Sequence, residues 1–244
     1  MRVVSLVPSL TEAVAVSGPG LLVGATDWCS HPADLDVVRI GGTKNPDVPA
    51  VVGLRPDLVI ANEEENRAPD LAALRDAGVE VLLTEVRDLD QAFTELERVL
   101  VTGCALPRPR WLDEAQQAWS RITPLTGLRA VVPVWRRPWM VLGRDTFAGD
   151  LLARLGVANV YADHEERYPR IPLEELRASG ADLVALPDEP YAFGPDDGPE
   201  AFPGLPASFL DGRHLTWYGP SLVTAPQVLS AALRAALRAA GLAG

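Results

Sequence analysis

The stretch "LRPDLVIANEEEN" (residues 54–66) decides the fold, because the second half of the chain repeats its pattern in "ASGADLVALPDEPYAF" (residues 178–193). In each stretch the end of a short helix leads through an aspartate into an apolar strand, and an acidic, polar loop follows the strand. A buried parallel strand places that loop at the carboxyl edge of its sheet, where open α/β sheets bind ligands. One such edge in each half predicts two lobes that hold a small ligand between them.

Short apolar strands alternate with helices along the whole chain, which is typical of parallel βα units. We expect strands at 3–7, 21–25, 58–61, 79–84, 129–134, 157–161 and 183–186. Helices are expected at 10–17, 48–54, 70–77, 90–101, 111–122, 145–155, 173–179 and 225–240. Ser9 is predicted to cap the first helix, together with Glu12 three residues later.

The segment 111–122 contains neither glycine nor proline and is preceded by "PRPR" (residues 107–110), so it predicts a stiff helix between the lobes. The predicted organisation is an N-terminal α/β lobe (1–108), an inter-lobe backbone helix (109–127) and a C-terminal α/β lobe (128–244). Each lobe is expected to be a three-layer α/β structure with a mainly parallel sheet. The alternative is a single sheet on which two helices pack.

Composition excludes some classes of partner. The 244 residues include 33 Asp and Glu against 22 Lys and Arg, a net charge of −11. Nucleic acids and anionic membrane surfaces attract basic patches, so neither is an expected partner. No apolar run approaches the length of about 18 residues that a membrane span needs, so we expect no membrane insertion. The two cysteines predict a reducing, cytoplasmic location; the alternative is a periplasmic or cell-surface protein whose leader has been removed.

Aromatic and charged residues in the predicted strand-end loops are the candidate ligand contacts. Tryptophan and tyrosine offer flat contact area with one polar tip, which suits planar macrocycles. Arg136 and the carboxylates of the "NEEEN" loop would orient the ligand. For the aromatic residues the alternative is core packing, for the glutamates a solvated helix N-terminus, and for Arg136 an ion pair with the acidic loop of the opposite lobe. The predicted set is Trp28, Glu63, Glu64, Glu65, Trp135, Arg136, Trp139, Tyr191, Phe193 and Trp217.

A thiol and an imidazole lie two residues apart in "TDWCSHP" (residues 26–32). Cys29 and His31 are good ligand types for Zn²⁺, Cu or Fe, and a glutamate of the "NEEEN" loop could add a further ligand. This pair supports a second hypothesis, a cytoplasmic metal-dependent enzyme or metal-handling protein. The alternative is a buried cysteine beside a histidine in a turn. No Gly-x-Ser-x-Gly elbow or other catalytic set is present, so the main expectation is a protein that is not an enzyme.

Five segments resemble the helical-backbone class (class III) of solute-binding proteins, in the branch related to the cobalamin-binding component of vitamin B12 uptake. They are "RVVSLVPSLTE", "GGTKNPDVPAVVGLRPDLVIANEEEN", "PWMVLGRDTFAGDLLARLGVANV", "IPLEELRASGADLVALPDEPYAF" and "DGRHLTWYGPSL". The resemblance implies two α/β lobes joined by one long helix, with a ligand cleft between them. It also implies a corrinoid, heme, ferric siderophore or metal-ion ligand, for which a corrinoid or a divalent metal is the candidate.

The sequence departs from this class in three places. No leader or lipid anchor is visible, and the inter-lobe helix is short for the class. Members of the class present one acidic residue on each lobe to a membrane permease. Glu174 lies near the second of these positions, whereas the first falls near Ala68, with Asp70 the nearest acid. These departures argue against permease docking and predict a cytoplasmic binding relative.

Overall fold

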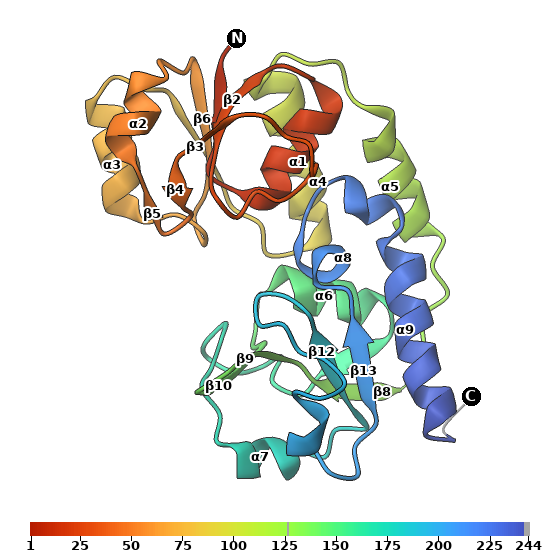
Figure 1. Ribbon diagram of the computed structural model, residues 1–244. Coiled ribbons are helices and arrows are strands. Elements are labelled where there is room, and N and C mark those ends of the chain that lie inside the picture. Colours follow the sequence, from red (N-terminus) through yellow and green to blue (C-terminus); the bar gives the residue numbers. More distant parts are fainter. Residues whose placement is uncertain (126, 242–244) are drawn as a thin grey trace. The chain divides into compact units, whose positions relative to one another are not determined.

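The computed structural model describes residues 1–125 and 127–241, which form two α/β units (Figure 1). The first unit contains Met1–Val86, Asp90–Glu114 and Tyr218–Pro220, and the second contains Arg87–Leu89, Ala115–Trp217 and the chain from Ser221 onwards. The helix α5 (Arg110–Ser120) lies within the predicted inter-lobe segment. The boundaries at 108 and 128 and the inter-lobe cleft stay predictions.

A parallel five-stranded sheet forms the centre of the first unit, in the order β3-β2-β1-β6-β7. The central strand β6 is buried along its whole length, as the apolar run after Asp57 predicts. A short antiparallel hairpin of β4 (Gly41–Gly42) and β5 (Asn45–Pro46) follows β3. The strands of the sheet are β1 (Val3–Ser5), β2 (Leu22–Ala25), β3 (Val38–Arg39), β6 (Leu58–Asn62) and β7 (Val81–Thr84).

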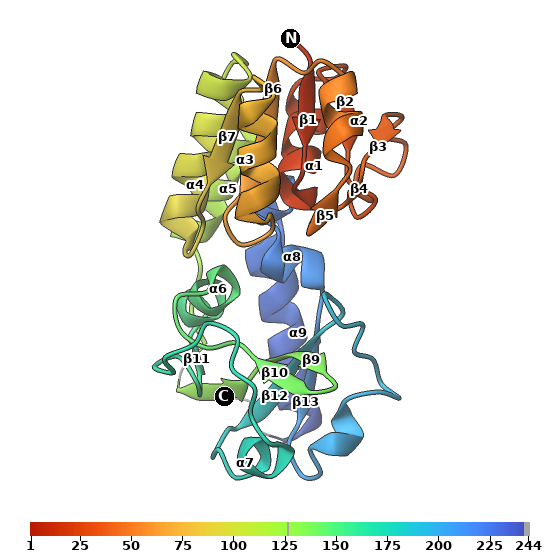
Figure 2. The ribbon, with the colours of Figure 1, turned by 90° about the vertical axis from the view of Figure 1, so that its left-hand side faces the viewer.

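Helices cover both faces of this sheet. Figures 1 and 2 show α2 (Val48–Gly53) and α3 (Ala68–Asp76) on one face, with α1 (Pro8–Ser17) and α4 (Leu89–Glu97) on the other. The predicted helix 90–101 is divided, because α4 ends at Glu97 and a π-helical segment, η1 (Arg98–Gly103), continues it. The core between the sheet and α2 and α3 consists of Val4, Leu6, Ile40, Val51, Val59, Ala61, Leu71 and Leu74.

The predicted cap of the first helix is wrong. The helix α1 begins at Pro8, with Val7 as its N-cap and no side-chain capping hydrogen bond, so Ser9 is already inside the helix. Proline suits the first helical position because its missing N–H would have no partner there. The Thr11 hydroxyl donates to the Val7 carbonyl at 2.9 Å instead of a side chain accepting from the helix.

The second unit contains a parallel sheet in the order β11-β8-β12-β13, with the central strand β12 fully buried. An antiparallel hairpin of β9 (Pro133–Arg136) and β10 (Trp139–Val141) follows β8. The predicted strand 129–134 is therefore split, and the split falls next to Pro133, which cannot donate a ladder hydrogen bond. The strands of the sheet are β8 (Leu128–Val131), β11 (Val157–Asn159), β12 (Leu183–Pro187) and β13 (Ala207–Leu210).

Leu176 of α7 (Leu173–Arg177) packs into a core with Val131, Val184 and Leu186, and α9 (Ala225–Ala239) lies on the other side of β13 (Figure 1). The helix α6 (Phe147–Arg154) is followed by Gly156 at φ +84°, where an added Cβ would stand 1.8 Å from the Leu125 carbonyl oxygen, so the predicted glycine stop is confirmed. Sequence reasoning missed β13 and two short helical segments, α8 (Gly212–Thr216) and η2 (Pro199–Ala201); a further one, η3 (Pro220–Val223), precedes α9. No helix in residues 1–125 or 127–241 combines the length and apolar character needed to cross a bilayer.

The two halves share a hydrogen-bonded bracket at the start of their sheets. The Asp57 carboxylate accepts from the Arg2 backbone N–H at 2.6 Å, and the Asp57 N–H donates to the Arg2 carbonyl at 2.8 Å. In the second unit the Asp182 carboxylate accepts from the Arg129 N–H at 2.8 Å, with the same return bond at 2.8 Å. Each bracket aligns a central strand with its neighbour. The aspartate that recurs before the apolar run in each half of the sequence therefore has the same structural role in both units.

We expect removal of either bracketing carboxylate to destabilise its sheet. The variants Asp57→Ala and Asp182→Ala should each lower the free energy of unfolding in urea by about 1 kcal/mol, because the hydrogen bond from a backbone N–H to an exposed carboxylate is lost. The matched control is Asp34→Ala, at an exposed loop aspartate, which should stay within about 0.5 kcal/mol of the wild type. Equal stability of all three variants would contradict the bracket.

Candidate functional site

In the first unit, the loop after β2 exposes Trp28 and buries Cys29. The Trp28 side chain is 69 % exposed, whereas Cys29 is fully buried. The Arg39 guanidinium donates to the carbonyl oxygens of Thr26 and Cys29, both at 2.9 Å, and so fixes the path of the loop. Because β2 is parallel to its neighbours, the loop lies at the carboxyl edge of the sheet. Trp28 is thus a rigidly presented, solvent-exposed ring at the predicted edge.

Cys29 and His31 do not form a metal site with the residues around them. The Cys29 sulfur lies 3.0 Å from the Thr11 hydroxyl and 3.1 Å from the Thr26 hydroxyl, and burial raises the pKa of the thiol. The half-buried His31 ring has its Nδ1 3.1 Å from the Ser30 hydroxyl. Among residues 1–125 and 127–241, no three His, Cys, Asp or Glu side chains are grouped so that they could hold a metal. The metal hypothesis stays a prediction without a ligand set, and the buried position of Cys29 matches its alternative.

Two asparagines hold the acidic loop after β6. The Asn62 side-chain oxygen accepts from the backbone N–H groups of Glu64 at 2.9 Å and Glu65 at 3.3 Å. The Asn66 side-chain oxygen accepts from the Asn62 N–H at 2.9 Å, and its amide donates to carbonyl groups of two neighbouring loops. Sequence reasoning noted the glutamates and missed these asparagines, although both flank the acidic run.

The three glutamates lie in a turn that precedes α3 rather than on the helix, because Arg67 is the N-cap. Glu63 is exposed and Glu64 and Glu65 are half-buried. The Lys44 ammonium donates to the Glu64 carbonyl. Burial raises the pKa of the Glu65 carboxyl, the neighbouring Glu64 raises it further, and Lys44 opposes both effects. The turn therefore concentrates negative charge at the same sheet edge as Trp28.

In the second unit, most of the predicted aromatic residues form one cluster. The hairpin contributes Trp135 and Trp139, and the loop after β12 contributes Tyr191 and Phe193. Trp135 meets Tyr191 edge-on with centroids 5.6 Å apart, and Trp139 stacks on Phe193 at 6.1 Å. Phe202, which sequence reasoning missed, packs edge-on against Trp139 at 5.4 Å. Both contributing segments follow the carboxyl ends of parallel strands, as predicted.

Arg136 is neutralised within its own unit. Its guanidinium forms ion pairs with Asp197 and Glu200 and lies 5.4 Å from the centroid of the Trp139 ring. The Tyr191 hydroxyl donates to the Asp197 carboxylate at 2.6 Å. This arrangement corrects the alternative that paired Arg136 with the acidic loop of the opposite lobe. Two carboxylates on one guanidinium leave this cluster with a net negative charge.

The backbone N–H of Gly198 donates to Glu200 at 2.7 Å, and this bond, followed by the Arg136 guanidinium, lowers the pKa of the Glu200 carboxyl. Glu200 therefore stays ionised and paired to lower pH than an ordinary glutamate. Asp197 and Glu200 were not predicted, although "GPDDGPEAF" (residues 194–202) is visibly acidic.

Exposure divides the predicted aromatic set. Trp135 is 43 % exposed, whereas Trp139 and Tyr191 are half-buried and Phe193 and Trp217 are 5 % and 7 % exposed. The Trp217 indole N–H donates to the Glu189 carboxylate at 3.0 Å, so this ring has a structural partner. The burial of Phe193 and Trp217 follows the core-packing alternative, and their contact with ligand stays a prediction.

A pocket of about 310 Å³ opens at the carboxyl ends of β12 and β13. Phe193 lines it, so this buried ring still borders open space at the edge. Phe209 of β13 also lines it and is itself 41 % exposed. The carboxylates of Asp188 and Asp211 complete the polar part of the lining, and both accept backbone hydrogen bonds, from Gly212 at 2.6 Å and His214 at 2.9 Å.

Comparison with known proteins places the fold. No family model matches the sequence. The vitamin B12-binding protein of Vibrio cholerae is 22 % identical over 203 residues, covering 79 % of this chain and 72 % of that protein. An uncharacterized ABC transporter substrate-binding lipoprotein of Bacillus subtilis is 27 % identical, covering 66 % of this chain and 56 % of the lipoprotein. The apo structure of a periplasmic heme-binding protein from Roseiflexus superposes with a TM-score of 0.78 at 22 % identity, covering 96 % and 98 % of the two chains.

The chain has the α/β fold of class III periplasmic binding proteins. The class III fold confirms the predicted α/β class with two parallel sheets, each covered by helices. It also agrees with the resemblance carried by the five sequence segments. A shared fold does not assign the roles of individual side chains, so the ligand residues stay predictions.

The buried thiols give a pH-dependent test of the core. Burial raises the pKa of the Cys104 thiol to about 11, from an ordinary value of 9.0. Below pH 9 the thiol is protonated in both the folded and the unfolded chain. Between pH 9 and 11 only the unfolded chain loses the proton, so the free energy of unfolding should fall, and this thiol's contribution should be gone above about pH 11.

Other groups titrate in the same pH range, so the contribution of Cys104 is measured as the difference in unfolding free energy between the wild type and a variant without this thiol. Urea unfolding of the wild type and of Cys104→Ala at intervals from pH 8 to 11 should show a shallower loss of stability in the variant. Parallel curves would contradict a raised pKa for Cys104.

Proposed function

We propose that this protein captures a small ligand with a flat, partly apolar surface, of the corrinoid, heme or other metal-chelate type, and performs no chemistry on it. The observation that carries the proposal is the exposure of one tryptophan at the carboxyl edge of the sheet in each unit, Trp28 and Trp135. An exposed tryptophan on a rigid loop offers a large, flat contact surface to a ligand at little conformational cost. Trp135 rests edge-on against Tyr191 and Trp28 lies on a loop fixed by Arg39, so both are pre-positioned.

Burial of these rings supplies enough free energy for useful affinity. If a ligand covers about 100 Å² of each ring, the apolar contact contributes roughly 2.5 kcal/mol per tryptophan. Pre-positioning reduces the conformational entropy that binding would otherwise cost. The vitamin B12-binding and heme-binding proteins that this chain resembles carry names that fit a macrocyclic ligand.

The charges around both rings favour a neutral or cationic ligand. The same sheet edge as Trp28 carries Glu63, Glu64 and Glu65. Beside Trp135, the single positive charge of Arg136 is paired with two carboxylates, so the net charge there is negative. Anionic groups brought to such surfaces are repelled, whereas amide-bearing or cationic ligands are not. Among the macrocycles, a corrinoid with amide side chains therefore fits better than heme with its two carboxylates.

The two acids closest to the permease-docking positions of class III proteins have arginine partners. Glu174 pairs with Arg177 at 3.1 Å, and Asp70 pairs with Arg67 at 2.9 Å. Exposed ion pairs of this kind are weak and exchange easily. These pairs alone therefore do not decide whether the two acids take part in docking, and the absence of permease docking stays a sequence-based prediction.

Trp28→Ala and Trp135→Ala should each weaken macrocycle binding about tenfold or more, because each removes roughly 2 kcal/mol of apolar contact. The measurement is tryptophan fluorescence quenching during titration with cyanocobalamin and, separately, with hemin. Val16→Ala is the control, since it shortens an exposed apolar side chain on α1 that lies outside the loops at the carboxyl edges of both sheets. Binding that is lost equally in all three variants, or absent in the wild type for both macrocycles, would refute the proposal.

The acidic turn gives a separate prediction about selectivity. Replacing Glu63, Glu64 and Glu65 together by glutamine should raise the affinity for hemin about threefold or more at low salt and leave that for cyanocobalamin within twofold, because three repulsive charges are removed. The gain should shrink at high salt. An unchanged preference between the two macrocycles would show that the turn lies away from the ligand.

A further inference from the structure

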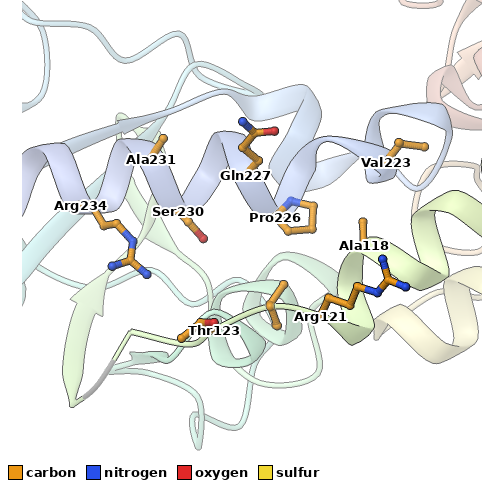
Figure 3. Close-up of a pocket in the computed structure, with 10 residues that line it drawn as sticks. Ala118, Arg121, Thr123, Val223, Pro226, Gln227, Ser230, Ala231 and Arg234 are labelled. Carbon is orange, nitrogen blue, oxygen red and sulfur yellow. The ribbon is translucent and has the colours of Figure 1, made fainter.

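A second hollow lies away from the sheet edges, along α9 of the second unit. It has a volume of about 460 Å³, within the range of small-molecule sites, and it is bordered by the end of α5, the chain that follows it, η3 and α9. All of its lining residues belong to the second unit. Figure 3 shows the lining side chains in a row between α9 and the segment that contains Thr123. We call this hollow the α9 groove.

A buried hydrogen bond joins two of the elements that border the α9 groove. The Trp119 indole N–H donates to the Leu222 carbonyl at 3.1 Å, which ties α5 to η3. Both residues are buried. Pro226, at the start of α9, is also buried and lines the groove. The hollow is therefore bounded by packed elements rather than by a loose loop.

The lining combines an apolar middle with a cation towards each end. Pro226 and Ala231 lie between the two arginines and supply apolar surface, Val223 extends this surface at the Arg121 end, and Ser230 supplies a hydroxyl (Figure 3). Arg234 stands towards one end of the row and Arg121 towards the other (Figure 3). No carboxylate is among the lining residues, although the chain carries 33 acidic residues and a net charge of −11.

Neither guanidinium has an ion pair or side-chain hydrogen bond to any residue in 1–125 or 127–241. Arg121 directly follows the carboxyl end of α5, where the exposed carbonyl groups of the helix favour a cation. These carbonyl groups explain the position of Arg121 but do not neutralise its charge. Arg234 lies within α9 and has no such explanation. Guanidinium groups bind carboxylates and phosphates through paired hydrogen bonds. Two guanidinium groups on either side of an apolar strip therefore suit a ligand with two anionic groups joined by an apolar chain.

We propose that the α9 groove binds an elongated organic dianion, with a carboxylate or phosphate at each end and an apolar middle. The lining residues of α9 run from Pro226 to Arg234, which is eight residues or about 12 Å along the helix, and a groove wall of this length suits a ligand chain of about ten carbons. The anionic ends contact Arg121 and Arg234, and the middle covers the apolar strip. This site is separate from the exposed tryptophans and does not depend on the proposed macrocycle function.

The test uses decanedioate as the dianion, with decanoate and 1,10-decanediol as probes that lack one or both charges. Calorimetric titration should show decanedioate binding at least tenfold more tightly than decanediol. Arg121→Gln and Arg234→Gln should each weaken decanedioate about tenfold, towards the affinity of decanoate. Arg238→Gln is the matched control, because Arg238 is exposed on the same helix one turn further along and does not line the groove.

Thermal melting of each variant checks that it is folded. The variant Ala231→Trp places a large side chain in the groove from α9, so it should abolish decanedioate binding while the protein stays folded. Trp28→Ala should leave decanedioate binding unchanged, which separates this result from the macrocycle proposal. The proposal is overturned if decanediol binds as well as decanedioate, if Arg238→Gln weakens binding as much as Arg234→Gln, or if the wild type binds no dianion.

Discussion

The structure depends on two central strands that are buried along their whole length and fixed at their amino ends by an aspartate. Asp57 precedes β6 and Asp182 precedes β12. Each exchanges hydrogen bonds with the backbone of an arginine near the start of the neighbouring strand: Arg2, just before β1, and Arg129, the second residue of β8. A parallel strand buried on both faces is specified weakly by its own apolar run, because valine, leucine and isoleucine pack almost equally well in a shifted register. The polar tie at one end removes that freedom.

The carboxyl ends of the same sheets are held by a different set of polar contacts. Asn62 and Asn66 fix the acidic turn after β6, and Arg39 fixes the loop that presents Trp28. In the second unit, Asp197 anchors both Arg136 and Tyr191 beside Trp135. These residues act on backbone and on neighbouring side chains, which leaves the exposed rings free to contact a ligand. Rigid presentation of this kind lowers the entropic cost of binding.

Much of this architecture was predictable from local pattern. The apolar runs after Asp57 and Asp182 gave both central strands, and Gly156 marked the end of α6. The strand β13 was missed because the four residues "ASFL" are too few to show a period that distinguishes a strand from a loop. Which candidate rings are exposed could not be predicted, because the exposure of Trp135 and the burial of Trp217 depend on contacts between distant segments. The partners of Arg136 were missed for the same reason, since Glu200 lies 64 residues further along the chain.

The paired brackets have a consequence for how such a protein can diversify. Because alignment of each sheet is settled at the amino edge, by Arg2 with Asp57 and by Arg129 with Asp182, insertions or substitutions in the turns at the opposite edge leave strand alignment intact. The residues that contact a ligand can therefore change without a change in the alignment of the strands. A lineage built on this plan can exchange one cargo for another through its turns alone, and the same separation makes those turns the natural place to engineer new specificity.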